Sequence, residues 1–418
     1  MYDFLFALFA LFYLPAFFLK GKHRNGAWRA RLLGEVPADA RRALAGRRVL
    51  WLHAVSVGEV VLALRLAASL KERFPGAKVL LTTTTAAGRE VAGKIKADDD
   101  TLLWFPADFR FAVKAFADAV KPSALILLET EIWPNLIREL SARKVPVFIV
   151  NGRISDRSIG AYRSLRGLLG PVLRLLSGIG AQDETMRSRF VELGADPART
   201  VVTGNVKFDW QPPVDREGAA AAIEKKIKTP GTFLCVAGST HEGEEEALFG
   251  MFESIRRSRP EFRLLIAPRH LERLPAIEAA AAKLGVKTRR VAEGGGDGGA
   301  VWLLDRMGVL ATLYRAADAV FVGGSLVPRG GHNLVEPAYY EKPLFFGPYM
   351  QNFREMADAF LKDGAAVQVK DAEDLERQLA ALLGDGERRK SLGQAARRLV
   401  SRHQGATRRN IDALLASL

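Results

Sequence analysis

Residues 323–348 read GGSLVPRGGHNLVEPAYYEKPLFFGP, and the rest of the chain can be interpreted outward from this stretch. It follows the apolar run 318–322, which is typical of a buried strand. Glycine pairs let backbone N–H groups approach an anion, and a helix opening at residues 332–334 would direct its positive end to the same place. Glu336, about one turn into that helix, can accept hydrogen bonds from ribose hydroxyls. The stretch therefore predicts a nucleotide site, with a plain glycine-rich turn as the alternative.

Length and composition favour a globular protein of two domains. A chain of 418 residues is too long for one ordinary domain, and 48% hydrophobic residues are enough to build two cores. The single cysteine, Cys235, lies in the apolar run TFLCVAG and is expected in a buried strand, so no disulfide within the chain is possible. A net charge of +14 implies an anionic partner, which can be a nucleic acid, an acidic membrane surface or a phosphorylated substrate.

The N-terminus predicts a membrane anchor over residues 1–20. Residues 4–19, FLFALFALFYLPAFFL, carry no charge, and with residues 1–3 they would form a helix of about 28 Å, which barely spans a bilayer. Asp3 precedes the run and Lys20 follows it, which is the reverse of a cleaved signal peptide and places the remaining chain in the cytoplasm. Because Pro15 can kink the helix, shallow insertion into one leaflet is the alternative.

A strongly basic segment follows the anchor. Residues 20–48 contain nine Lys or Arg and two acidic residues, a surplus of 9 − 2 = +7. Such a segment beside an anchor is typical of contact with anionic lipid headgroups. A solvated basic face is the less favoured interpretation.

From residue 48 onward, short apolar runs alternate with amphipathic stretches such as 59–74 and 109–120. This rhythm predicts an α/β fold with parallel sheets covered on both faces. The strands are expected at residues 49–53, 78–82, 124–128, 145–150, 201–204, 232–237, 262–267, 301–304, 319–322 and 343–346. The expected organisation is a first Rossmann-like domain over 21–208, a linker over 209–230, a second Rossmann-like domain over 231–400, and a C-terminal helix over 401–418 as a candidate to pack back on the first domain.

Unusual polar motifs follow the expected strands and should share one edge of each sheet. They are HAVSVGE (53–59), ETEIWPN (129–135), NGR (151–153), GNVK (204–207), GSTH (238–241), PRH (268–270) and the stretch from residue 323. Ligands of doubly wound folds bind outside the carboxyl ends of the strands, so this clustering predicts a site in a cleft between the two lobes.

Carboxylates at this edge are candidates for proton transfer. Glu59 lies where a helix is expected to begin, a position that favours the ionised form, so desolvation must raise its pKa if it is a general base. A first-turn glutamate placed for the helix dipole is the equally weighted alternative. Glu129 and Glu131 flank Thr130 and should point in different directions, toward substrate or toward structural partners.

Basic and histidine side chains supply candidates for anion binding. Arg269 and Lys207 suit phosphate or carboxylate, although single basic residues after strands are common. His53, His270 and His332 can act as acids or as hydrogen-bonded turn residues, and their spacing does not decide between these roles. The sequence HEGEE from residue 241 lacks the second histidine of a zinc motif, and no Walker lysine loop or GxSxG elbow is present, so a metal-free mechanism without a cofactor is favoured.

Seven motifs together resemble the family of 3-deoxy-D-manno-octulosonic acid (Kdo) transferases of lipid A biosynthesis, from the N-terminal anchor to about Asn352. They are HAVSVGE, ETEIWPN, GNVKFD, AGSTHEGEE, APRH, DRMG and FVGGSLVPRGGHNLVEPA. The resemblance implies a GT-B glycosyltransferase, with an acceptor lobe first and a CMP-Kdo lobe second, on the cytoplasmic face of an inner membrane. Leu271 stands where members often have proline, and Gly152 where they often have alanine.

The resemblance also implies roles for individual residues. Glu59 would be the catalytic base that deprotonates the primary hydroxyl of a lipid A precursor (lipid IVA), which attacks Kdo with inversion and releases CMP. The implied donor site consists of Gly238, Ser239, Thr240, Arg269, His270, Met307, Gly308, Gly330, Gly331, His332, Asn333 and Glu336. The residues assigned to the acceptor or to the structure of the cleft are Ser56, Gly58, Glu129, Glu131, Asn151, Arg153 and Lys207.

Two alternatives differ from this interpretation. A membrane-associated transferase of the same fold would use a UDP-sugar donor. A membrane-tethered nucleic-acid binder would also explain the positive charge, but the charge is concentrated beside the anchor and no recognition-helix or aromatic RNP pattern is evident.

Overall fold

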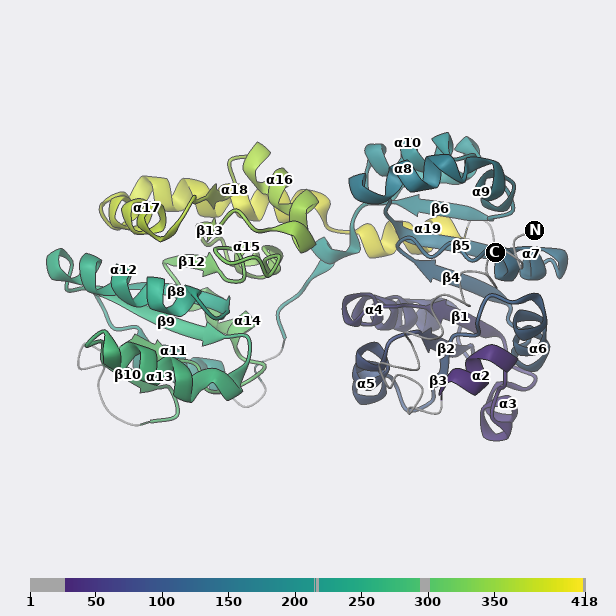
Figure 1. The fold of residues 1–418 in the computed structure, drawn as a ribbon, viewed down its shortest axis with the longest axis horizontal. Helices are drawn as coiled ribbons and strands as arrows, with labels where there is room; N and C mark the ends of the chain where they lie inside the picture. Colours follow the sequence, from purple (N-terminus) through teal and green to yellow (C-terminus); the bar gives the residue numbers. More distant parts are fainter. Residues whose placement is uncertain (1–26, 214, 216–217, 294–300, 416–418) are drawn as a thin grey trace. The chain divides into compact units, whose positions relative to one another are not determined.

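The chain forms two compact units in a computed structural model that describes residues 27–213, 215, 218–293 and 301–415. The first unit extends to Asp209 and resumes at Gly405, and the second is Trp210–Gln404 (Figure 1). Each unit has its own parallel sheet, so each is described by itself. The expected anchor over residues 1–20 lies outside the described residues, and within the described ranges no helix is long and apolar enough to cross a membrane.

The first unit is built on a seven-stranded parallel sheet in the order β3-β2-β1-β4-β5-β6-β7. The strands are β1 (Val49–His53), β2 (Lys78–Thr83), β3 (Thr101–Trp104), β4 (Ala124–Leu128), β5 (Val147–Gly152), β6 (Gly178–Ala181) and β7 (Thr200–Val202). The strand order reverses between β1 and β4, which pair from Leu50 against Ala124 to His53 against Leu127. A ligand of a doubly wound fold is expected at the carboxyl ends of strands at such a point.

Helices cover both faces of this sheet. They are α2 (Ala27–Leu33), α3 (Ala38–Leu44), α4 (Val57–Arg73), α5 (Ala86–Ile95), α6 (Arg110–Val120), α7 (Pro134–Ala142), α8 (Asp156–Ser164), α9 (Arg166–Leu173), α10 (Glu184–Glu192), α19 (Ala406–Leu415) and the 3₁₀ turns η2 (Pro197–Arg199) and η3 (Val206–Asp209). Strand β1 shows why both faces need cover: Val49 and Trp51 enter one core cluster, whereas Leu50 and Leu52 enter the other. Strands buried on both faces read as continuous apolar runs, as here.

The C-terminal helix α19 belongs to the first unit, although it follows the whole second unit in sequence. It packs beside α4 and against β5 and β6, where Ile411 and Leu414 join the core cluster (Figure 1). The Asp209 carboxylate accepts hydrogen bonds from the backbone N–H groups of Gly405, Ala406 and Thr407, which satisfies the open donors at the start of this helix. The chain therefore returns to the first unit beside the point where it left.

The second unit has a seven-stranded parallel sheet in the order β10-β11-β9-β8-β12-β13-β14. The strands are β8 (Phe233–Thr240), β9 (Phe262–Pro268), β10 (Thr288–Arg290), β11 (Val301–Leu303), β12 (Ala319–Val322), β13 (Leu344–Phe346) and β14 (Val367–Gln368). The helices are α11 (Ala219–Ile227), α12 (Glu244–Ser258), η4 (Leu271–Arg273), α13 (Leu274–Lys283), α14 (Leu310–Leu313), η5 (Tyr314–Ala316), α15 (Val335–Tyr339), η6 (Gln351–Phe353), α16 (Arg354–Lys362), α17 (Ala372–Gly384) and α18 (Gly386–His403). The order reverses between β8 and β12, and Cys235 of β8 is fully buried as expected.

Several strand boundaries differ from the sequence expectations for physical reasons. Strand β5 begins at Val147, not at Val145, because Pro146 has no N–H to donate to the ladder. Strand β8 continues to Thr240 through an irregular register against β9, at a point where Ser239 adopts a left-handed φ of 58°. Two strands of the first unit, β3 and β6, were not among the expected ones, since the first is only four residues long and the second, GIGA, has little apolar surface.

Candidate functional site

Glu59 lies at the start of α4, where it forms a capping box with Ser56. The Ser56 hydroxyl accepts a hydrogen bond from the Glu59 backbone N–H at 3.3 Å, and the Glu59 carboxylate accepts from the N–H of Ser56 at 3.3 Å and of Val55 at 2.9 Å. These contacts fix the position of the carboxylate. They also leave acceptor capacity, because a carboxylate offers about four lone-pair directions and two are used.

The environment of Glu59 suits a proton acceptor, and a helix cap alone would not require such an environment. Its side chain is buried, with 8% of its surface exposed. Burial raises the pKa of Glu59, and the negative charges of Glu129 and Glu131 raise it further, against the opposing effect of the bonds from Val55 and Ser56. A raised pKa brings the carboxylate nearer to the range in which a general base is effective.

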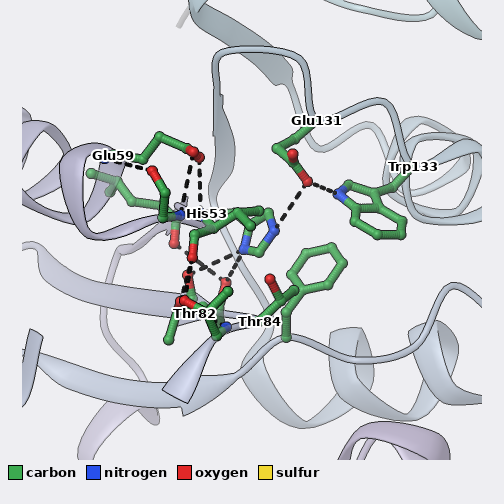
Figure 2. Close-up of polar contacts among 12 residues, drawn as sticks. His53, Glu59, Thr82, Thr84, Glu131 and Trp133 are labelled. Carbon is green, nitrogen blue, oxygen red and sulfur yellow. Dashed lines mark hydrogen bonds and ion pairs between the residues drawn. The ribbon is translucent and has the colours of Figure 1, made fainter. Parts of the chain in front are cut away.

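His53 and Glu131 form a second polar contact at the carboxyl edge of this sheet (Figure 2). The Nε2 atom of His53 lies 3.6 Å from the Oε2 atom of Glu131, which also accepts a hydrogen bond of 2.9 Å from the indole of Trp133. On its other side, His53 Nδ1 contacts the Thr82 hydroxyl at 3.0 Å and the Thr82 carbonyl at 3.1 Å. The ring is fully buried and stacks on Phe105 at 3.7 Å between centroids. Burial lowers the pKa of His53, although Glu131 opposes this.

Glu129 and Glu131 have different partners, as their spacing predicts. Glu129 adopts a left-handed φ of 58° after β4, and its carboxylate lies 3.3 Å from the ammonium of Lys207. A left-handed backbone at a residue other than glycine is strained, and such strain is concentrated at functional sites. Glu129 and Lys207 therefore hold each other at the edge where Glu59 and Glu131 also lie.

Asn151 and Arg153 have structural contacts. Asn151 is fully buried with a φ of 54°, its side-chain oxygen accepts a hydrogen bond from the Val206 backbone N–H, and its own N–H donates to Asn410 of α19. The backbone carbonyl of Arg153 accepts a hydrogen bond from the Thr130 hydroxyl. These contacts tie the end of β5 to η3, to the C-terminal helix and to the loop after β4.

The second unit has a cavity of about 290 Å³ at the carboxyl edge of its sheet. Seven members of the expected donor site line it, namely Ser239, Arg269, Met307, Gly308, His332, Asn333 and Glu336. Its apolar lining includes Leu271, Leu304, Leu310, Tyr314 and Phe353. The Asn333 amide donates to the Glu336 carboxylate at 3.2 Å. A cation, a carboxylate and an apolar wall in one cavity suit a ligand with a phosphate, sugar hydroxyls and a flat ring.

The other expected donor residues are not among those that line the cavity. A Cβ atom at Gly238 would overlap the hydroxyl of Tyr314, so glycine is required for this close approach. Gly330 and Gly331 have left-handed φ values of 93° and 72°, and Cβ atoms there would overlap Asn352 and Met350. Thr240 is buried and donates to Glu245, whereas His270 is exposed and lies 3.4 Å from Glu272.

The glycine-rich stretch is held in place by Glu244, which the sequence reasoning did not single out. Its buried carboxylate accepts four backbone hydrogen bonds, from His241 at 2.9 Å, Gly324 at 2.7 Å, Ser325 at 3.0 Å and Leu326 at 2.9 Å. The run of acidic residues in HEGEE, opening a helix, was the available signal. The predicted helix at residue 332 is the short α15, which begins at Val335.

His241 is a second residue that the sequence reasoning passed over. Its Nε2 atom lies 3.0 Å from the Nε2 atom of His332, and the two rings are nearly parallel, with 2° between their planes. Burial lowers the pKa of both histidines, to about 4 for His332. The two motifs that carry these histidines lie 91 positions apart, so only the fold reveals their contact.

Among the residues that the structure describes, no group of three or more His, Cys, Asp or Glu side chains is arranged to hold a metal ion. The first sheet instead presents carboxylates at its edge, and the second presents a cavity with cationic and neutral donors.

Comparison with known proteins identifies the family. The sequence model described as 3-deoxy-D-manno-octulosonic-acid transferase (kdotransferase) matches residues 26–210, and that of glycosyl transferases group 1 matches residues 298–399. The 3-deoxy-D-manno-octulosonic acid transferase of Haemophilus influenzae is 32% identical over 87% of this chain and 86% of its own length. The chain belongs to the Kdo transferase family. The Kdo transferase of Bordetella pertussis is 34% identical over 94% of each chain, which confirms the resemblance inferred from the seven motifs.

A solved glycosyltransferase from Rickettsia africae shares the fold of this Kdo transferase family member. The TM-score is 0.57, with 13% identity over 89% of this chain and 98% of that one. Identity this low speaks for the fold alone. The two Rossmann-like units are those of the GT-B class, as the resemblance to Kdo transferases implied.

Proposed function

We propose that this protein transfers Kdo from CMP-Kdo to the primary hydroxyl of a lipid A precursor, with inversion at the anomeric carbon and release of CMP. Membership of the Kdo transferase family supports the reaction class. The observation that carries the donor assignment is the cavity of the second unit, in which Arg269 and Glu336 face one space at the reversal point of the sheet.

The donor half of the reaction is assigned to the second unit. When the bond from the anomeric carbon to the phosphate oxygen breaks, the electron pair leaves with CMP and the phosphate gains negative charge. Arg269 is exposed at the cavity, where its guanidinium can bind that phosphate. Glu336 and the apolar wall around Tyr314 would hold the ribose hydroxyls and the base.

The acceptor half is assigned to the first unit. The acceptor hydroxyl would lose its proton to the Glu59 carboxylate while its oxygen forms the new bond to the anomeric carbon. One displacement of this kind inverts the configuration and needs no covalent intermediate. Burial and the raised pKa of Glu59 support this role, and the contacts with Val55 and Ser56 hold the carboxylate in a fixed position.

We also propose that the protein acts at the cytoplasmic face of an inner membrane. Trp28 and Leu33 of α2 are 39% and 42% exposed, and they lie within the basic segment 20–48 that follows the uncharged run at residues 4–19. Exposed aromatic and basic side chains beside an apolar segment suit an anionic lipid surface, where a lipid acceptor is found.

The test is incubation of the purified full chain with CMP-Kdo and a tetraacylated lipid A precursor, followed by mass spectrometry of the lipid product. We expect a product heavier by whole Kdo units, and the number of increments gives the number of transfers. Competition by CMP but not by UDP is expected. An unmodified lipid together with binding of UDP, but not of CMP, to the protein would instead support the transfer of a UDP-sugar.

A further inference from the structure

The His241–His332 contact restricts how many protons the two rings can hold. Their Nε2 atoms are 3.0 Å apart, which is a hydrogen-bond distance. Two bare nitrogens would repel each other there, and two N–H groups would clash, so one proton lies between them. The remaining proton sites are the two Nδ1 atoms. The pair is therefore neutral when one Nδ1 atom is protonated, and it carries a single positive charge when both Nδ1 atoms are protonated. Only a second positive charge would require the contact between the Nε2 atoms to break.

The contact is built into the fold. The His241 backbone N–H donates to Glu244, whose carboxylate also holds the loop that includes Gly324. Gly324 has a left-handed φ of 65°, and a Cβ atom there would lie 3.1 Å from the His241 ring and 3.2 Å from the His332 ring. A side chain at this position would therefore press on both rings. His332 in turn lines the cavity beside Arg269.

Positive groups surround the pair on several sides. Arg269 follows β9, Arg273 lies in η4, and Arg329 lies in the glycine-rich stretch. After burial, which has the largest effect, these groups lower the pKa of His241 or His332, so the pair is neutral at neutral pH when the cavity holds no anion. The acidic groups near the pair are Glu244, Glu245, which pairs with Arg273, and Glu336, which lines the cavity.

We propose that the His241–His332 pair takes up one proton when the phosphate of the cytidine donor binds, so that the pair adds its own positive charge to those of Arg269 and Arg306 only in the occupied site. The inference rests on the proposed donor site. A phosphate offsets the repulsion from the surrounding cations, and a hydrogen bond between imidazolium and imidazole is stronger than one between two neutral rings. The stored charge then stabilises CMP as its phosphate gains charge during bond cleavage. His241 is a positioning residue, because it acts through His332.

The first test measures proton uptake when CMP binds to the full chain, by isothermal titration calorimetry in two buffers of different ionisation enthalpy. The CMP phosphate itself titrates at about pH 6. The contribution of the pair to proton uptake is therefore the difference in uptake between the wild type and the double variant H241F/H332F. At about pH 6 we expect the wild type to take up roughly half to one proton more per CMP bound than the double variant. His403 lies on α18 outside the cavity lining, so H403Q should match the wild type.

A double-mutant cycle on CMP affinity tests whether the two rings act as one unit. Each of H241F and H332F should weaken CMP binding roughly tenfold, and the double variant should bind about as well as either single one. Ring carbon chemical shifts of the histidines in the wild type alone give a readout that does not depend on variants folding. They should move toward the imidazolium value when CMP is added.

The outcomes separate this proposal from the proposed function. If CMP binds the wild type without more proton uptake than the double variant, the proposed role of the pair is wrong. The same follows if the losses of CMP affinity in the two single variants multiply in the double variant. Either result would leave the donor site itself unaffected. Absence of CMP binding to the wild type would overturn both.

Discussion

Replacement of Glu244 by glutamine tests whether one buried carboxylate holds the glycine-rich stretch in its ligand-binding shape. The four N–H groups bonded to Glu244 occupy all the lone-pair directions of the carboxylate, two on each oxygen. Glutamine has almost the same size but offers one oxygen and one NH₂ group. Whichever way the amide is turned, two backbone N–H donors will face another donor.

The magnitude follows from these two lost bonds. A buried donor left without a partner costs about 1–3 kcal/mol, so two cost about 2–6 kcal/mol. Burial raises the pKa of Glu244, which means that its negative charge is costly to bury. Removal of that charge therefore offsets part of the loss in stability. We expect a net loss of about 2–4 kcal/mol in the free energy of unfolding of the second unit, which for a unit of this size lowers its melting temperature by roughly 5–12 °C.

The assay is thermal unfolding by calorimetry of the full chain, with CMP affinity measured on the same samples below the transition. Glu246 lies in the same first turn of α12 and is exposed, so E246Q is the matched control and should change the melting temperature by less than about 1 °C. E244Q should also weaken CMP binding, because residues 324–326 lose their anchor. If the melting temperature of E244Q equals that of E246Q and of the wild type, the Glu244 carboxylate does not hold the glycine-rich stretch in shape and the reasoning fails.

Further predictions concern the proposed acceptor and donor residues. E59Q should retain CMP binding and lower turnover by about a hundredfold to ten-thousandfold, and unchanged turnover would remove Glu59 from the role of base. Because only ionised Glu59 accepts a proton and burial raises its pKa, turnover of the wild type should fall on the acid side with a midpoint above the usual glutamate value; a midpoint at or below that value would contradict the buried base. R269A should weaken CMP binding by roughly tenfold to a hundredfold, and an unaltered affinity would contradict the phosphate contact. G238A should destabilise the protein by about 1–3 kcal/mol, because the added Cβ atom overlaps Tyr314. G250A should stabilise α12 by about 0.5–1 kcal/mol, because a Cβ atom there meets nothing within 4 Å. Similar effects of the two substitutions on thermal unfolding would refute the packing argument.

Much of the fold is predictable from the sequence because buried parallel strands leave a strong local signal. The runs at residues 49–53, 124–128 and 319–322 match β1, β4 and β12 residue for residue, since each follows a polar residue and is apolar apart from His53 at the end of the first. Strands β10 and β14 have three and two residues, too few for a pattern to stand out. Whether the short apolar run at β6 is a strand depends on its neighbours β5 and β7, which supply the hydrogen bonds.

The candidate site is predictable as a location and less so as a set of contacts. The motifs that carry Glu59 and Arg269 follow predicted strands, so their position at the edge of a sheet follows from parallel topology. The links that organise the edges join residues far apart in sequence, such as Glu244 to Gly324 and His241 to His332. Such pairs can be found only when the strand order is known. For a glutamate in the first turn of a helix, the sequence does not decide between a helix cap and a functional role until its hydrogen-bond partners are known.

The two units share a topology and differ in the charge presented where the strand order reverses. Both place a non-glycine residue in a left-handed conformation at a strand end there, Glu129 after β4 and Ser239 in β8. In the first unit burial raises the pKa of Glu59, and the nearby carboxylates of Glu129 and Glu131 raise it further, which favours uptake of a proton. In the second unit they are arginines and histidines, which favour an anion. A transfer in which a hydroxyl loses a proton while a phosphate gains charge requires both environments, and it is simplest to keep them on separate sheets, because adjacent opposite charges would neutralise each other and restore an ordinary pKa to the base.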